Sequence, residues 1–259
     1  MKIGLVLSGG GARGFAHFGV LKALNELQIA VHIISGTSSG ALAGAFYAAG
    51  FDPEETFRMI SQTKIIRLMR PAFSRFGLLK MEEVAKELSR YFGNKTFADL
   101  AIKLVVCATD INRATLVYFT EGELVKPLLA SSSVPILYQP ISYQNRLLID
   151  GGLLNNMPVE CVMGESDFII GVHTNPMDYQ RDIHTFKDLV ERTFHLAINN
   201  NVEPRLKLCN FLIEPPGLKQ YSLLNIKKAK EMFLSGYEHT MHLAPSLLAQ
   251  LEVQRANIN

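Results

Sequence analysis

The sequence has no large excess of charge of either sign and no long apolar run. Its 26 lysine and arginine residues nearly balance its 24 aspartate and glutamate residues, giving a formal net charge of +2. This balance excludes the broad nucleic-acid binding that a strongly basic chain would favour. Every apolar run is far shorter than the roughly 20 residues of a membrane-spanning helix, and the first breaks at glycine too early for a signal peptide. We therefore expect a cytoplasmic protein without a nucleic-acid partner.

Cysteine is scarce, and the common metal-binding motifs are missing. Cys107, Cys161 and Cys209 lie far apart in apolar stretches, which is typical of unpaired, buried thiols in a reducing compartment. The sequence contains neither CxxC nor HExxH, so no metal site is expected. It also lacks internal repeats, low-complexity tracts and a convincing linker. We therefore expect residues 1–259 to form a single domain.

Short apolar runs alternate with helical patterns along the chain. Residues 2–7 form a continuous apolar run, typical of a strand buried on both faces of a parallel sheet. Further strands are expected at 30–35, 102–109, 115–120, 147–149, 167–173 and 208–214. Helices are expected at 14–27, 39–49, from 53 onward, and at 81–91, 123–132, 186–202 and 224–251. This alternation predicts a three-layer α/β/α domain with a mainly parallel sheet.

The segment Gly36-Thr37-Ser38-Ser39-Gly40 has a glycine two residues before and two residues after Ser38. A β-branched apolar run (30–34) precedes it, and a helix rich in small residues (41–49) follows it. This pattern predicts a nucleophile elbow, in which a serine lies on a strained turn between a strand and a helix. The two flanking glycines allow the turn to close and leave the hydroxyl accessible.

A second motif, Ser8-Gly9-Gly10-Gly11-Ala12-Arg13-Gly14, follows the first predicted strand. Consecutive glycines let backbone N–H groups converge on a negative charge near the positive end of a helix. Two functional interpretations are open beside that of a plain tight turn. The glycine spacing matches the dinucleotide-binding fingerprint, but the second strand ends without the acidic residue that this fingerprint expects. The serine found there instead favours an oxyanion hole for acyl transfer.

A third motif, Asp150-Gly151-Gly152, follows another short predicted strand. A carboxylate followed by two glycines can lie against a neighbouring loop without side-chain obstruction, and a nucleophilic serine needs a partner that takes its proton. A D-G pair is also common in ordinary turns, which is the simpler interpretation of this motif alone. All three motifs, however, fall at predicted strand ends, where open α/β sheets bind ligands.

The order of these motifs resembles the patatin-like phospholipases, and the chain is similar to their small bacterial members. The resemblance covers about the first 160 residues and includes two further segments, 130–135 (ASSSVP) and 155–158 (NNMP). It implies a patatin-like fold with a motif-bearing core over about 1–160, completed by the C-terminal part. It also implies hydrolysis of carboxylic esters of lipids, such as (lyso)phospholipids, with release of fatty acid and without a metal or organic cofactor.

The resemblance assigns roles to individual residues. Ser38 would be the nucleophile and Asp150 the proton acceptor of a Ser–Asp dyad. Oxyanion stabilisation and substrate binding would fall to Gly9, Gly10, Gly11 and Arg13. Support of the three motifs would fall to Gly14, Gly36, Gly40, Gly151 and Gly152. Ser8 stands where many members of the family carry aspartate, at a position that is not catalytic in the family.

The dyad poses a physical problem, because a free aspartate with a pKa of about 3.9 is a weak base for an alcohol. It becomes stronger in a site that excludes water and bonds the hydroxyl directly. A Ser–His–Asp triad is the rival arrangement, and His173, directly after a predicted strand, is the best placed of seven histidines. His17, near the glycine loop, fits packing or capping better than tuning of that loop. A regulatory or binding module with weak or vestigial esterase activity is the alternative function.

A basic and apolar stretch follows the elbow helix. No acidic residue occurs between Glu55 and Glu82, and residues 58–80 interleave arginine and lysine with methionine, isoleucine, leucine and phenylalanine. Such a composition suits contact with an anionic membrane surface. A lid or channel wall over Ser38 is a second interpretation, and an ordinary helix and loop with a solvated basic face is a third.

Overall fold

The computed structural model describes residues 1–62, 81–179, 182–223 and 225–258. Its sheet has eight strands, seven of them in the order β5-β6-β3-β2-β1-β7-β8, with β4 paired to β3. The strands are β1 Ile3–Leu7, β2 Ile33–Thr37, β3 Lys103–Asp110, β4 Thr115–Phe119, β5 Ile141–Tyr143, β6 Arg146–Asp150, β7 Phe168–Val172 and β8 Phe211–Ile213. The helices are α1 Phe15–Glu26, α2 Ser39–Ala48, α3 Pro53–Gln62, α5 Glu82–Phe92, α6 Val125–Ser131, α7 Glu160–Met163, α8 Phe186–Leu206 and α9 Ala229–Ile258.

The sheet is mostly parallel, which confirms the predicted fold class. Strands β3, β2, β1, β7 and β8 are parallel neighbours. Antiparallel pairing is confined to one side of the sheet, where β4 and β6 pair with β3, and β5 pairs with β6. The parallel strands are buried on both faces, as their continuous apolar sequences predict.

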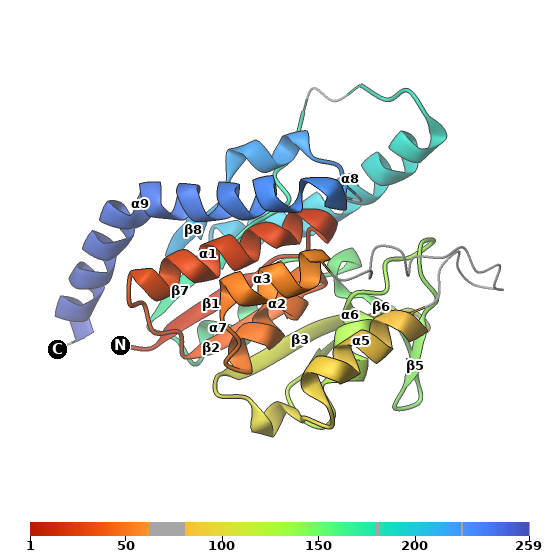
Figure 1. Ribbon diagram of the computed structural model, residues 1–259, viewed down its shortest axis with the longest axis horizontal. Coiled ribbons are helices and arrows are strands. Elements are labelled where there is room, and N and C mark those ends of the chain that lie inside the picture. The colour runs from red at the N-terminus through yellow and green to blue at the C-terminus, as the bar shows by residue number, and fades with distance from the viewer. Residues whose placement is uncertain (63–80, 180–181, 224, 259) are drawn as a thin grey trace.

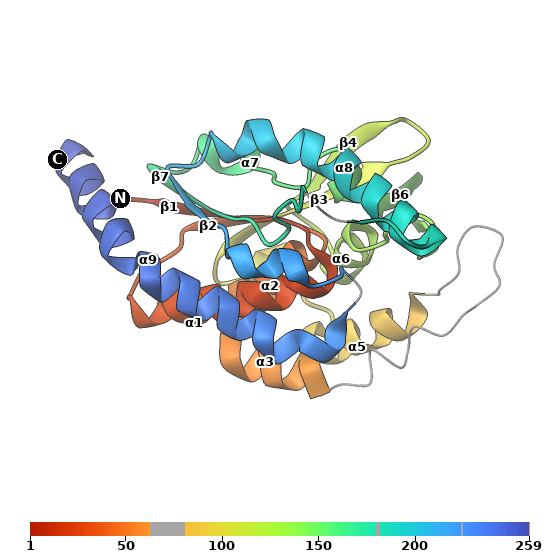
Figure 2. The ribbon, with the colours of Figure 1, turned by 90° about the horizontal axis from the view of Figure 1, so that it is seen from above.

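Helices cover both faces of the sheet (Figures 1 and 2). Helices α1, α2, α3 and α9 lie on one side, and α7 and α8 lie on the other. Successive side chains of β1 point alternately toward these two layers of helices. Leu5 and Leu7 belong to the larger apolar core beneath the first group of helices, whereas Val6 packs with Val162 of α7 and Ile198 of α8.

Element boundaries differ from the expected ones where tertiary contacts decide them. Strand β2 begins at Ile33 rather than at residue 30, because its pairing with β1 begins there. Strand β5 and helix α7 were not expected, since each has fewer than five residues. Helix α8 continues past Val202 to Leu206 although it contains Pro204. Helix α9 begins only at Ala229, after a short 3₁₀ turn.

The structure bears only in part on the basic stretch and confirms only in part the expected burial of the cysteines. Most of the basic stretch 58–80 lies outside the described residues, and within α3 Arg58 pairs with Glu54 at 2.5 Å. Of the three cysteines, all unpaired, only Cys107 is fully buried, whereas Cys161 and Cys209 are half-buried. Throughout the described part of the chain, no helix combines the length and apolarity that crossing a bilayer requires.

Candidate active site

Ser38 lies on the tight turn between β2 and α2. Its backbone has φ 54° and ψ −125°, a conformation that residues other than glycine rarely adopt. The turn is crowded: a Cβ at Gly40 would lie 2.2 Å from the carbonyl oxygen of Leu7, and one at Gly36 would lie 2.7 Å from the amide nitrogen of Ala41. Only glycine fits these two positions, so the elbow predicted from G-x-S-x-G forms as expected.

Ser131 of α6 forms a hydrogen bond to the backbone of the elbow. The hydroxyl of Ser131 accepts a hydrogen bond from the backbone N–H of Ser38 at 2.8 Å and donates one to the carbonyl of Cys107 at 2.6 Å. Two residues later, the carbonyl of Ser133 accepts the backbone N–H of Asp150 at 2.9 Å. The segment 130–135 was singled out only by the resemblance to the patatin-like family. Its hydrogen bonds link the backbone of Ser38 to the backbone of Asp150.

Asp150 reaches the elbow from an antiparallel strand. Thr37, the last residue of β2, pairs with Cys107 of β3, but β3 continues for three more residues. Strand β6 pairs with this overhang and runs back along it, so that Asp150 lies opposite Ala108. Asp150 therefore lies beside the end of β2, next to the elbow. A Cβ at Gly151 would lie 2.4 Å from the carbonyl oxygen of Cys107, so this close return requires glycine.

The Asp150 carboxyl group is buried, and burial dominates its chemistry. Its side chain accepts the backbone N–H of Gly152 at 2.7 Å. Loss of hydration raises its pKa from 3.8 to about 6, while the Ser38 side chain and the Gly152 N–H act in the opposite direction. Asp150 is thus ionised at neutral pH, yet is a much stronger base than a free aspartate.

The glycine loop lies against the elbow. A Cβ at Gly9 would lie 3.2 Å from the Cβ of Ser38 and 2.2 Å from Oδ1 of Asn156. The amides of Gly9 and Gly10 donate to protein atoms, namely the Asn156 carbonyl at 3.2 Å and the Ser39 hydroxyl at 3.0 Å. Within the described ranges the amide of Gly11 has no such acceptor. A ligand anion would therefore find the Gly11 amide unpaired, with the first amides of α2 nearby.

Two further glycines complete these motifs. A Cβ at Gly14 would lie 2.3 Å from the Cβ of Ser39, so α1 can begin beside the elbow only with glycine there. A Cβ at Gly152 would lie 2.6 Å from Oδ1 of Asn156. All the glycines that the sequence marked as motif support thus lie where two segments approach closely.

Arg13 points away from the glycine loop toward the C-terminal third of the chain. Its guanidinium is buried and donates to Oδ1 of Asn175 at 2.7 Å and to the carbonyls of Tyr221 at 2.7 Å and Lys219 at 3.3 Å. These bonds hold the loop against the segments that follow β7 and β8. Contact of Arg13 with substrate stays a prediction.

The histidines near the loop have other partners than Ser38. His173 follows β7, and its Nδ1 lies 2.5 Å from Oε2 of Glu214 beyond β8, on the far side of β1 from the elbow. Nε2 of His17 lies 2.8 Å from the carbonyl oxygen of Ser8, and burial lowers the pKa of this histidine to about 4. Ser38 instead lies beside Asp150, whose pKa its side chain lowers. This geometry favours a dyad over a triad.

The C-terminal third covers the glycine loop. The carbonyl of Leu223 accepts the N–H of Ala12 at 2.8 Å, and a Cβ at Gly11 would lie 2.5 Å from that carbonyl oxygen. A dinucleotide would need open space over this turn for its pyrophosphate. The occupied space therefore disfavours the nucleotide-binding interpretation of the loop.

A serine on a strand-to-helix elbow, within a mostly parallel sheet covered on both faces, places the chain among the α/β folds built around a nucleophile elbow. Residues 5–163 match the sequence profile of the patatin-like phospholipases, and the chain belongs to that family. The match ends at the last residue of α7, so β7, β8, α8 and α9 lie outside it.

Similar proteins support this assignment. An uncharacterised NTE family protein of Mycobacterium tuberculosis is 34% identical over 177 residues, which are 67% of this chain and 49% of that protein. Lysophospholipase nte1 of Aspergillus fumigatus is 27% identical over 270 residues, 91% of this chain and 18% of that protein. VipD from Legionella pneumophila shares the fold, with a TM-score of 0.64 and 16% identity over 95% of this chain and 67% of that one. The chain spans about half the length of the mycobacterial relative.

Proposed function

We propose that this protein hydrolyses carboxylic esters of lipids, such as (lyso)phospholipids, with Ser38 as nucleophile and Asp150 as the single base. The observation that carries the proposal is a buried carboxyl group, with its pKa raised to about 6, placed beside the serine of the elbow. Membership of the patatin-like phospholipase family supports the reaction class. The relative that is named a lysophospholipase supports a lipid substrate.

The first half of the reaction forms an acyl-enzyme. Oγ of Ser38 attacks the ester carbonyl carbon while its proton moves to the Asp150 carboxylate. The carbonyl oxygen becomes an oxyanion, which the Gly11 amide and the first amides of α2 stabilise. The bond to the alcohol then breaks, and Asp150 returns its proton to the leaving oxygen. An alcohol such as a glycerol compound leaves, and the acyl group stays on Ser38.

The second half releases the fatty acid. A water molecule gives its proton to Asp150 and attacks the acyl carbon, which forms a second oxyanion at the same amides. The bond to Oγ of Ser38 breaks, and Ser38 regains its proton from Asp150. One carboxyl group thus serves as base and acid in turn. Burial makes this possible, since a pKa near 6 lies close to the pH at which the protein would work.

A fluorophosphonate probe followed by peptide mapping tests this proposal. We expect one label per chain, at Ser38, because among the serines that the structure describes this one combines a buried base with an unpaired amide for the phosphonyl oxygen. Hydrolysis of a lysophospholipid, followed by fatty-acid release, would establish the substrate class. Labelling elsewhere, or no labelling, would contradict the enzymatic role. Lipid binding with intact structure and no turnover would support the alternative, a binding module with a vestigial dyad.

Peripheral contact with an anionic membrane is a finer part of the proposal, and it depends on the composition of residues 58–80. Charge reversal at Arg67 and Arg70 is expected to weaken binding to phosphatidylserine vesicles at least about tenfold, given about 1 kcal/mol per basic side chain near such a surface. Sedimentation with sucrose-loaded vesicles measures this. Activity on a water-soluble short-chain ester serves as the control and should stay unchanged. Equal vesicle binding by the variant and the wild type would remove the membrane role of this stretch.

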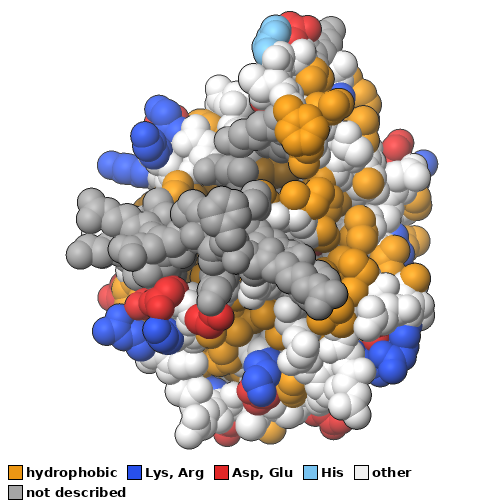
Figure 3. Space-filling model, turned by 90° about the vertical axis from the view of Figure 1, so that its right-hand side faces the viewer, with side chains coloured by type: hydrophobic (Ala, Val, Ile, Leu, Met, Phe, Trp, Pro, Cys, Tyr) orange, Lys and Arg blue, Asp and Glu red, His pale blue; other side chains and the backbone are white. Residues whose placement is uncertain are grey.

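The face toward which the parallel strands run also suits a lipid substrate. Hydrophobic side chains gather on the side of the molecule that Figure 3 shows, which is the side where α8 begins. Phe186 at the start of α8 is 81% exposed, and Tyr179 in the preceding loop is 79% exposed. A contiguous exposed apolar patch is typical of a surface that meets a ligand, a partner or a membrane.

A further inference from the structure

Asn201 of α8 contacts the turn that follows Asp150, although α8 lies outside the part of the chain that matches the family. Its Nδ2 donates to the carbonyl of Gly152 at 3.0 Å and to that of Leu153 at 3.3 Å. Its Oδ1 accepts the backbone N–H of Asn156 at 2.9 Å. Both ends of one amide group are therefore used to hold a single five-residue turn.

This turn connects the two functional loops. At its first end, the N–H of Gly152 bonds the carboxylate of Asp150 at 2.7 Å. At its other end, Asn156 pairs with Gly9 in both directions: its Nδ2 donates to the Gly9 carbonyl at 3.0 Å, and its carbonyl accepts the Gly9 N–H at 3.2 Å. Asn201 thus holds both ends of this turn. Its bond to the Gly152 carbonyl holds the residue that bonds Asp150, and its bond to the Asn156 N–H holds the residue that pairs with Gly9.

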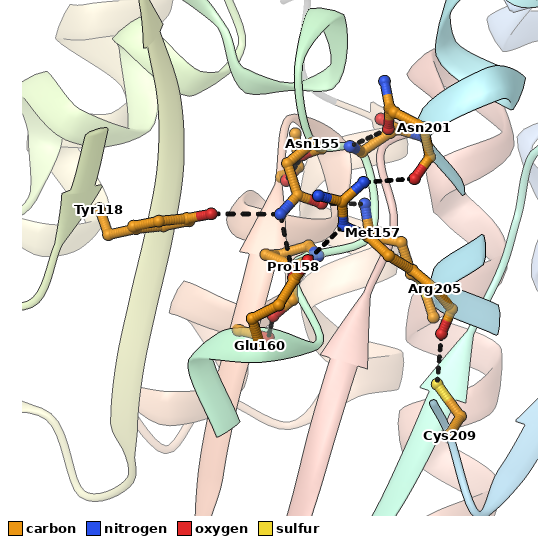
Figure 4. A network of polar contacts seen from close by, with 11 residues as sticks. Tyr118, Asn155, Met157, Pro158, Glu160, Asn201, Arg205 and Cys209 are labelled. Carbon is orange, nitrogen blue, oxygen red and sulfur yellow. Dashed lines mark hydrogen bonds and ion pairs between the residues drawn. The ribbon is translucent and has the colours of Figure 1, made fainter. Parts of the chain in front are cut away.

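The next turn of α8 extends the support to the elbow (Figure 4). Nε of Arg205 bonds Oε1 of Glu160 at 2.6 Å, and Oε2 of Glu160 accepts Nδ2 of Asn155 at 3.1 Å. The carbonyl of Asn155 accepts the hydroxyl of Thr37, the residue before Ser38, at 2.9 Å. Figure 4 shows the Asn201 and Arg205 side chains reaching from α8 toward this segment.

We propose that Asn201 is a positioning residue for ester hydrolysis, which sets the distances between Asp150, Ser38 and the glycine loop from outside the three sequence motifs. The inference rests on the proposed function. Without the Asn201 amide, two carbonyls and one N–H of the turn lose their protein partner and rebond to water or to one another. Since a displacement of about 1 Å can lower a rate about a hundredfold, small movement of this turn suffices to slow the chemical step.

The test compares Asn201→Ala and Asn201→Asp with the matched control Asn200→Ala, an exposed neighbour on the same helix. For each protein we measure the rate constant and the final stoichiometry of fluorophosphonate labelling, and kcat and KM for a short-chain p-nitrophenyl ester. We expect full final labelling in all variants. In both Asn201 variants the labelling rate and kcat should fall about ten- to a hundredfold, with KM within about twofold. Asn200→Ala should match the wild type.

The two variants separate positioning from folding. Asn201→Asp keeps the shape and the acceptor oxygen but replaces the donor by an oxygen that faces two carbonyls, so it tests the amide even if Asn201→Ala folds poorly. Wild-type rates per labelled site, with only the labelled fraction reduced, would show a structural role and overturn the proposal. An unlabelled wild-type protein would instead overturn the proposed function itself.

Discussion

Replacement of Ser38 by alanine is expected to abolish fluorophosphonate labelling and to reduce ester hydrolysis by at least about a thousandfold. The reason is chemical, because Ser38 is the serine on the elbow that lies beside the raised-pKa carboxyl group of Asp150. Residual hydrolysis would come from the oxyanion amides alone. Labelling rate and p-nitrophenyl ester turnover measure the effect, and the exposed Ser89→Ala serves as a control that should change neither.

The backbone of Ser38 makes a second result expected from the same position. Its φ of 54° with ψ of −125° costs about 1–3 kcal/mol for a residue with a side chain. Ser38→Gly removes this cost but adds about 1 kcal/mol of backbone entropy in the unfolded state. We therefore expect Ser38→Gly to be as inactive as Ser38→Ala but to unfold at a temperature a few degrees higher. Equal melting temperatures of the two variants would argue against strain at the elbow.

Asp150→Asn is expected to combine loss of activity with a gain in stability. Asparagine cannot accept the proton of Ser38, so kcat should fall on the order of a hundredfold to ten-thousandfold. The wild type, in contrast, must hold an ionised carboxylate in a site that is 3% exposed. Its pKa is raised to about 6, so ionisation at pH 7 destabilises the fold by up to about 3 kcal/mol, and the uncharged amide relieves part of this.

The sign of the pH dependence follows from the same pKa. Between pH 4 and 6 the folded state binds this proton and the unfolded state does not, so the contribution of Asp150 to stability falls as pH rises through that window. Urea unfolding at pH 4 and pH 7.5 should show a stability difference between Asp150→Asn and wild type only at the higher pH. The wild-type kcat/KM should decline below pH 6, the pH at which the base becomes protonated.

Two outcomes would contradict this account of Asp150. An acid limb of the activity profile near pH 4 would show that the carboxyl group is solvated, as a free aspartate is. Destabilisation of Asp150→Asn at pH 7.5 would show that the ionised form is the favoured one. Asp182→Asn, at an exposed position, is the control and should alter neither the activity profile nor the pH dependence of unfolding.

The local sequence was sufficient for most of the fold. The buried parallel strands and the amphipathic helices were predicted because their signal is continuous over five or more residues, as at Ile3–Leu7 and Phe15–Glu26. Strand β5 was missed because only three residues pair, beyond a hairpin turn in which Gln144 and Asn145 both have positive φ. Helix α8 was expected to end at Val202, which would have removed Arg205 from it.

The sequence by itself determined the chemical inventory and the sharp turns of this protein. Glycine is required at positions 36, 40 and 151 because the backbone there approaches other backbone atoms too closely for a Cβ, and a short local motif is enough to encode this requirement. The tertiary structure decided how the inventory is assembled. Asp150 meets Ser38 because β6 runs antiparallel along the overhang of β3, a pairing that no local pattern encodes.

The structure alone also decided the electrostatics and the outer support. The pKa of Asp150 is raised because surrounding elements from distant parts of the chain exclude water from it, and burial of this kind is a property of the whole fold. No sequence motif identifies Asn201, because a side chain that bonds a backbone group 45 residues away needs only the right position on a helix face. Residue identity fixed which groups could react, and long-range packing fixed which of them meet.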